Sequence, residues 1–112
     1  MTDCGAVIRE LGAVISGQLG GDPEQSYVAS LSGVNQAQAL KKIGEEAIET
    51  ILAANSGDPG EIIHESADLV FHLMVLLAQH DLSLDQVFNE LQNRRGVSGL
   101  REKALRSDAK SG

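Results

Sequence analysis

Two pairs of carboxylates, each with a spacing of three positions, are the side chains in this sequence best suited to do chemistry. Glu46 and Glu49 form the first pair, and Glu65 and Asp68 form the second, with fifteen residues between the pairs. Residues three apart on a helix share one face, so each pair can contact a common partner. Residues 43–93 contain ten acids and no Lys or Arg that could offset them. Because carboxylates avoid burial without a cation, we expect these four to bind Mg²⁺ or Mn²⁺; the alternative is an ordinary solvated acidic face.

The apolar pattern around these pairs predicts two long helices joined by a tight turn. The first begins after a cap at Asn35 and runs to about Ala54, and the second runs from about Glu61 to Gln79. The sequence NSGDPG breaks the chain between them. Both helices are apolar almost all round except for one narrow acidic stripe, a pattern typical of buried helices. If the two pack antiparallel with their stripes facing, four carboxylates converge in an internal cleft.

The rest of the chain predicts shorter helices and no strands. They are expected over residues 6–17, within 26–34, over about 84–94 and within 100–112. Ser83 and Gln86 form a capping box at the start of the third of these. No alternating strand pattern or repeat is visible. The expected fold is an all-α helical bundle in one domain, residues 1–112, with a frayed tail from about residue 107.

Composition limits the class of protein. The net charge is −7, which argues against nucleic-acid binding because that affinity comes mainly from Lys and Arg. Only three aromatic residues are present, so the core must be built mainly of aliphatic side chains. Cys4 is the single cysteine, which fits a reducing compartment. The start lacks signal-peptide features and the longest apolar run, 69–78, is too short to span a bilayer. A soluble cytoplasmic protein without membrane partners is expected.

Longer stretches around the carboxylates carry a family resemblance. "KKIGEEAIETILAA" and "EIIHESADLVFHLMVLLAQHDLSLDQVFNELQNRR" resemble the phosphoribosyl-ATP pyrophosphohydrolase family, which belongs to the MazG-like all-α nucleotide pyrophosphatases. The signature of that group is Glu-x-x-Glu, a spacer and Glu-x-x-Asp. The form KxGEEAxE, from Lys42 to Glu49, and the tail SGLREKALR resemble the histidine-pathway branch more specifically. One position departs from the resemblance, since Ser30 stands where the family usually has a basic residue.

The resemblance implies an activity and an assembly. It implies Mg²⁺-dependent hydrolysis of phosphoribosyl-ATP to phosphoribosyl-AMP and pyrophosphate, the second step of histidine biosynthesis. It also implies a homodimer whose helices complete each other's clefts and supply missing core.

Within that reaction, the residues around the stripe receive expected roles. Glu46, Glu49, Glu65 and Asp68 are the expected metal ligands. Glu45 could bind metal or act as base on the attacking water, and Glu46 is the other expected catalytic residue. Lys42 lies one turn before Glu46 and could contact a phosphate, or could form an ion pair with Glu46. His72 lies in line with Glu65 and Asp68 and could contact substrate, or could be a buried histidine with satisfied hydrogen bonds.

Several alternatives remain open from the sequence. The same metal site would serve a house-cleaning pyrophosphohydrolase of non-standard nucleoside triphosphates. A non-enzymatic helical dimerisation module with an acidic groove is a second alternative, and an acidic nucleic-acid mimic has only net charge in its favour. Glu61 and His64 match one Glu-x-x-His element of a di-iron bundle, but the second element is missing, since leucines stand three residues before His72 and His80.

Overall fold

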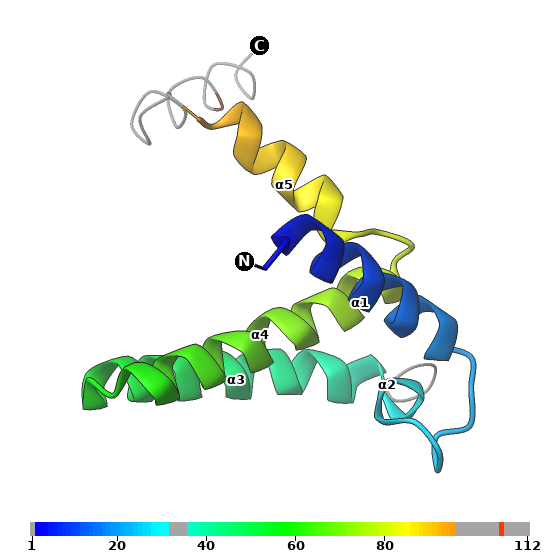
Figure 1. Cartoon of the computed structure of the whole chain (residues 1–112). Coiled ribbons are helices and arrows are strands. Elements are labelled where there is room, and N and C mark those ends of the chain that lie inside the picture. The colour runs from blue at the N-terminus through cyan, green and yellow to red at the C-terminus, as the bar shows by residue number, and fades with distance from the viewer. Residues whose placement is uncertain (1, 32–35, 96–105, 107–112) are drawn as a thin grey trace.

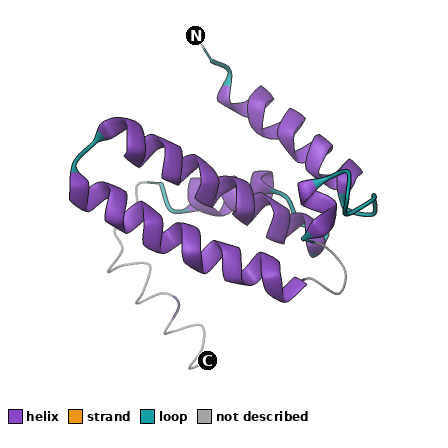
Figure 2. Cartoon of the chain, turned by 90° about the horizontal axis from the view of Figure 1, so that it is seen from below, coloured by secondary structure: helices purple, strands orange, loops and turns teal. Residues whose placement is uncertain are grey.

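The computed structural model describes residues 2–31, 36–95 and 106, and its main elements are helices throughout (Figures 1 and 2). The predicted all-α fold class is confirmed, with no strand among the described residues. The helices are α1 (Cys4–Gln18), α2 (Tyr27–Ser30), α3 (Gln36–Ser56), α4 (Pro59–Gln79) and α5 (Leu84–Asn93). No helix in the described part of the chain is long and apolar enough to cross a bilayer.

The two long helices form an antiparallel hairpin with a shorter connection than the sequence suggested (Figure 1). α3 continues to Ser56 and α4 already begins at Pro59, so only Gly57 and Asp58 remain between them. Gly57 has a φ of +79°, which glycine adopts without steric cost. Asp58 caps α4 by accepting a hydrogen bond from the Gly60 backbone N–H at 3.0 Å. Pro59 suits the first helical position, which explains why the helix starts two residues earlier than predicted.

A threonine between the two helices fixes their register. The Thr50 hydroxyl lies 2.7 Å from the Glu46 carbonyl oxygen on its own helix and 3.2 Å from the Glu65 carbonyl oxygen on α4. The two helices run antiparallel with the same rise per residue. A position nearer the start of α3 therefore lies beside a position nearer the end of α4. Glu46 therefore lies near the level of Asp68, and Lys42 lies near the level of His72.

The hydrophobic core lies at one end of this hairpin, where α1, α2 and α5 meet α4. Ile15 of α1 and Val75 of α4 are its most deeply buried large side chains. The other buried members of the cluster are Val28, Leu31, Ala39, Met74 and Leu84. At the start of α5, the Ser83 backbone N–H donates to the Gln86 side chain at 2.9 Å, and the predicted capping box is confirmed. α5 then leads away from the hairpin (Figure 1).

The far part of the hairpin exposes apolar side chains, and the prediction of two fully buried helices is wrong for the single chain. Ile63 is 70% exposed, and Ile48, Ile51 and Leu52 are also exposed. In this region α3 and α4 pack against each other, and no third helix of the described residues lies beside them (Figure 1).

Some predicted features lie outside the described residues. These are the cap at Asn35, the short helix within 100–112 apart from Arg106, and the frayed tail from about residue 107.

Candidate functional site

Three of the four carboxylates predicted to bind metal come together between α3 and α4. Glu46 and Glu49 from α3 and Glu65 from α4 each place one oxygen so that the three lie within 4.8 Å of one another. Glu46 is only 6% exposed. The Oε2 atoms of Glu46 and Glu65 are buried and have no hydrogen-bond partner within the described structure. Two unpartnered acidic oxygens in one place are unfavourable in the protein alone, and the group is therefore a possible cation site.

The pKa of Glu65 reflects the same unfavourable grouping of carboxylates. Burial raises the pKa of the Glu65 carboxyl, a hydrogen bond with Glu49 and the negative charges of Glu49 and Glu46 raise it further, and His64 lowers it. A raised pKa means that the folded chain resists ionisation of this group. A bound cation would reverse that preference, because it stabilises the ionised carboxylates.

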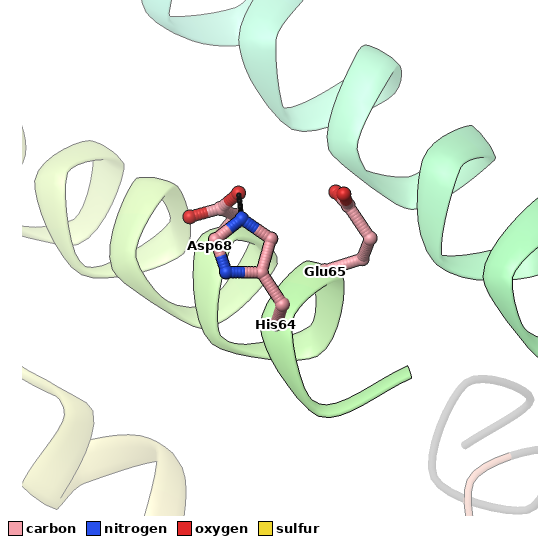
Figure 3. Close-up of side chains that lie close together, drawn as sticks. All are labelled: His64, Glu65 and Asp68. Atoms are coloured by element: carbon pink, nitrogen blue, oxygen red, sulfur yellow. Dashed lines mark ion pairs between the residues drawn. The ribbon is translucent and has the colours of Figure 1, made fainter. Parts of the chain in front are cut away.

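Asp68 belongs to a second group that shares Glu65 with the first. One ligand atom from each of His64, Glu65 and Asp68 lies within 4.8 Å of the others. His64 Nε2 is 3.5 Å from Asp68 Oδ2, one turn along α4. Figure 3 shows the Glu65 carboxylate pointing toward the neighbouring α3 ribbon, while His64 and Asp68 lie against each other at its side. Glu65 therefore joins two groups of possible ligands.

From the sequence, His64 was considered only as part of one Glu-x-x-His element, and its position beside Asp68 was not predicted. Its spacing of four from Asp68 was the available signal, because residues four apart on a helix are neighbours.

Lys42 and Glu45 form the end of the stripe beyond Glu46. Lys42 Nζ lies 3.3 Å from Glu45 Oε2 and 3.5 Å from Glu46 Oε1. The hydrogen bond with Glu45 is the largest cause that raises the pKa of the Lys42 ammonium. The ion pair with Glu46 that the spacing suggested is present. Lys41, by contrast, reaches only the exposed Glu45 carboxylate, at 3.9 Å. The predicted phosphate contact of Lys42 and the predicted action of Glu45 on water stay predictions.

His72 is buried, and both of its ring nitrogens have protein partners. Nδ1 lies 2.8 Å from the Asp68 carbonyl oxygen, and Nε2 lies 2.8 Å from the Tyr27 hydroxyl. This matches the alternative of a buried histidine with satisfied hydrogen bonds, and a contact between His72 and substrate stays a prediction. Tyr27 was not singled out from the sequence, because 45 positions separate it from His72.

An open cleft of about 560 Å³ lies beside the carboxylates, toward the α3–α4 turn. Glu49 and Glu65 form its inner wall, Leu52 and Ala53 give it an apolar side, and the rest is lined by Asp58, Gly60, Glu61 and His64. Glu49 and Glu65 thus open onto this cleft, whereas Glu46 and Asp68 are not among its lining residues.

Comparison with known proteins places the sequence among nucleotide pyrophosphohydrolases. A family model described as phosphoribosyl-ATP pyrophosphohydrolase matches residues 8–95. A protein of Nitrosomonas eutropha named phosphoribosyl-ATP pyrophosphatase is 44% identical over 96% of this chain and 92% of its own length. A protein of the same name from Erythrobacter litoralis is 48% identical over 90% of this chain and 97% of its own. One from Methylibium petroleiphilum is 52% identical over 88% of this chain and 82% of its own.

Proposed function

The chain belongs to the phosphoribosyl-ATP pyrophosphohydrolase family, and from that membership we propose that it hydrolyses phosphoribosyl-ATP to phosphoribosyl-AMP and pyrophosphate with Mg²⁺ bound by its clustered carboxylates. The reaction is the second step of histidine biosynthesis. The relatives cover most of the chain from end to end, so the activity in their name can be carried by the described helices.

The observation that carries the metal part of this proposal is the pair of buried, unpartnered oxygens on Glu46 and Glu65. The donor set is almost entirely carboxylate oxygen, which suits Mg²⁺ and also Mn²⁺. Glu46, Glu49, Glu65 and Asp68 would hold the ions, and His64 lies next to them. Bound divalent ions would neutralise phosphate charge and make a water molecule more acidic.

Other residues of the chain would then bind phosphate and accept a proton. Lys42 is one turn from Glu46, and its ammonium could move from Glu45 to a phosphate oxygen of the substrate. Glu45 is partly exposed, and in the described part of the chain it forms ion pairs with Lys41 and Lys42, so it is available to accept a proton from water. Water adds across the α–β phosphoanhydride, pyrophosphate leaves, and the released proton passes to this carboxylate.

We further propose that the working form is a homodimer. The exposed apolar side chains of the hairpin, which include Ile48, Ile51 and Ile63, form a surface that a monomer does not usually leave in water. A second copy would bury this surface and enclose the neighbouring acidic cleft. A cytoplasmic location fits the pathway and the exposed, free thiol of Cys4.

The decisive experiment is pyrophosphate release from phosphoribosyl-ATP, with Mg²⁺ or with a chelator, beside a panel of standard and damaged nucleoside triphosphates. We expect Mg²⁺-dependent release from phosphoribosyl-ATP alone. Release from the triphosphates instead would support the metal site but would indicate a house-cleaning pyrophosphohydrolase. No release from any of these compounds would support the non-enzymatic dimerisation module.

A further inference from the structure

Tyr27, at the start of α2, is held against α4 while half of its surface stays open. Its hydroxyl lies 2.8 Å from His72 Nε2. Its ring meets the His72 ring edge-on, with centroids 5.7 Å apart, and stacks near Phe71 with centroids 6.5 Å apart. Tyr27 is nevertheless 50% exposed. The ring is therefore fixed by its neighbours and still accessible to a ligand.

The partners of His72 decide which way the hydrogen bond to Tyr27 runs. His72 Nδ1 lies 2.8 Å from the Asp68 carbonyl oxygen. A carbonyl oxygen only accepts, so Nδ1 must carry the proton. In the neutral ring, Nε2 then has a lone pair and accepts the proton of the Tyr27 hydroxyl. The Tyr27 oxygen has no proton left to donate, and toward any further partner it can act only as an acceptor.

The Tyr27 hydroxyl lies at the Lys42 end of the acidic stripe. The register of the hairpin puts His72 near the level of Lys42, about one turn beyond Glu46 and Asp68. Burial raises the pKa of the Tyr27 hydroxyl; among nearby charges, Lys42 lowers it, while Glu46 and Asp68 raise it further. These influences agree with a position beside the carboxylate site.

An obligate acceptor at this place selects among the groups of a bound nucleotide. Phosphate oxygens are acceptors themselves, so they gain nothing from Tyr27. The Lys42 ammonium already has carboxylate partners in Glu45 and Glu46. The sugar adjoining the phosphates carries hydroxyl groups, which can donate.

We propose that Tyr27 is a substrate-binding residue whose oxygen accepts a hydrogen bond from a sugar hydroxyl of the nucleotide, and that His72 positions it for this role. The inference rests on the proposed function, since it takes the nucleotide to be bound at the carboxylates. It assigns His72 to holding Tyr27 rather than to contacting substrate.

The direction of the hydrogen bond can be measured before any substrate is added. In a sample with ¹⁵N-labelled histidine, we expect the neutral His72 ring to be protonated at Nδ1, with its signals assigned from the His72→Gln variant. A ring protonated at Nε2 would donate to Tyr27 instead, and that result would overturn the proposal.

Kinetics of matched variants then test the contact itself. Tyr27→Phe keeps the ring and removes the hydroxyl, so we expect KM to rise about five- to tenfold, the usual effect of one hydrogen bond, with kcat changed by less than about twofold. His72→Asn keeps a donor for the Asp68 carbonyl but loses the acceptor for Tyr27, and should behave like Tyr27→Phe. His72→Gln can place its amide oxygen near the position of Nε2 and should stay close to wild type.

His80→Asn is the matched control, because His80 ends α4 and its Nε2 is 3.3 Å from the exposed side chain of Gln36. We expect wild-type KM for this variant. If His72 had only a structural role, both His72 variants would have a lower thermal midpoint, and their KM values would not differ from each other. Tyr27→Phe changes no buried apolar contact and keeps the test valid if a His72 variant fails to fold.

Binding of the two products locates the contact on the ligand. By calorimetry with Mg²⁺, we expect Tyr27→Phe to weaken phosphoribosyl-AMP about five- to tenfold and to leave pyrophosphate unchanged. Equal weakening of both products, or of neither, would overturn the inference. An inactive wild-type protein would instead mean that the proposed function fails, whereas active wild type with an indistinguishable Tyr27→Phe variant would reject only the role of Tyr27.

Discussion

At the scale of single residues, the candidate carboxylate site is an unfavourable arrangement that the proposed Mg²⁺ would relieve. Glu46 and Glu65 each bury an oxygen without a partner, and the pKa of Glu65 is raised by burial and by Glu49 and Glu46. For an acid whose pKa is higher in the folded state, the stabilising contribution is complete below its unfolded pKa. It is lost as the pH rises through the folded value. At neutral pH the metal-free protein is therefore weakened by its own site.

Glu65→Gln should separate stability from activity. Without metal at neutral pH, we expect the thermal midpoint to rise by a few degrees, because the amide removes one of the mutually repelling charges. The stabilisation by Mg²⁺ that we expect for wild type should be absent from this variant. Its kcat/KM should fall by more than about 100-fold, which exceeds the usual effect of mutating a residue that only supports a metal ligand. Thermal unfolding with chelator and with Mg²⁺ gives the first readout, and pyrophosphate release gives the second.

Glu90→Gln is the matched control for this change, since Glu90 is an exposed acid that pairs with Arg94 at 3.2 Å on α5. It should alter neither the response to Mg²⁺ nor turnover. A Glu65→Gln protein that Mg²⁺ still stabilises as much as wild type would contradict the metal role of Glu65.

Tyr27 allows a second test at this scale, because it is the single tyrosine and the chain has no tryptophan. Its near-ultraviolet titration should show a pKa above 10 in the folded protein, chiefly because burial disfavours the phenolate. Lys42→Met should raise this pKa further, since the Lys42 charge lowers it. The stability that Tyr27 contributes is complete below its unfolded pKa and is lost as the pH rises through the folded value.

Lys41→Met provides the comparison, because Lys41 carries the same charge one position earlier and is not among the groups that shift Tyr27. It should leave the titration of Tyr27 as in wild type. If both lysine variants moved the curve equally, the effect would be one of net charge and not of proximity to Lys42.

At the scale of elements, the α3–α4 hairpin positions the site, and its short turn and the Thr50 hydrogen bond to α4 together hold the register. Only Gly57 and Asp58 connect two helices of 21 residues each. A change in this turn would slide one acidic stripe past the other. The turn therefore matters to the site although it lies several helical turns away from Lys42 and His72.

Gly57→Ala should destabilise the protein by about 1 kcal/mol or more, because alanine is strained at a φ of +79°. Gly17→Ala is the matched control. Gly17 lies in α1 with open space where a Cβ would be, so alanine should stabilise the helix by up to about 1 kcal/mol. Urea unfolding of both variants measures the two effects, and a neutral Gly57→Ala would show that the turn tolerates another backbone conformation.

At the scale of the whole molecule, the hairpin extends beyond the core and leaves apolar surface in water. The core gathers α1, α2 and α5 against one end of α4, and the other end of the hairpin is only two helices thick. Exposed isoleucines on both long helices give this end an apolar surface of the kind that homodimer interfaces bury.

Ile63→Lys should therefore convert a dimer into a monomer at micromolar concentrations, because a lysine at the centre of an apolar interface would lose its hydration. Sedimentation velocity measures the change. Val7→Lys, at an exposed apolar position on α1, should remain dimeric. A wild-type protein that is monomeric at these concentrations would contradict the proposed assembly.

The sequence alone determined the all-α class, the long helices and the two acidic stripes, because each depends on local periodicity and on residues three or four apart. It also determined the capping box of Ser83 and Gln86, which is a local hydrogen-bond pattern. It did not show that Asp58 and Pro59 start α4, since the same residues also read as a helix breaker.

Only the tertiary structure decided which side chains from distant segments meet. It put Glu65 between two ligand groups, left the apolar faces of α3 and α4 uncovered, and joined Tyr27 to His72 across 45 positions. Such contacts depend on the packing of α2 against α4 and on the register set at Thr50. No pattern along the chain encodes them, because the partners are far apart in sequence.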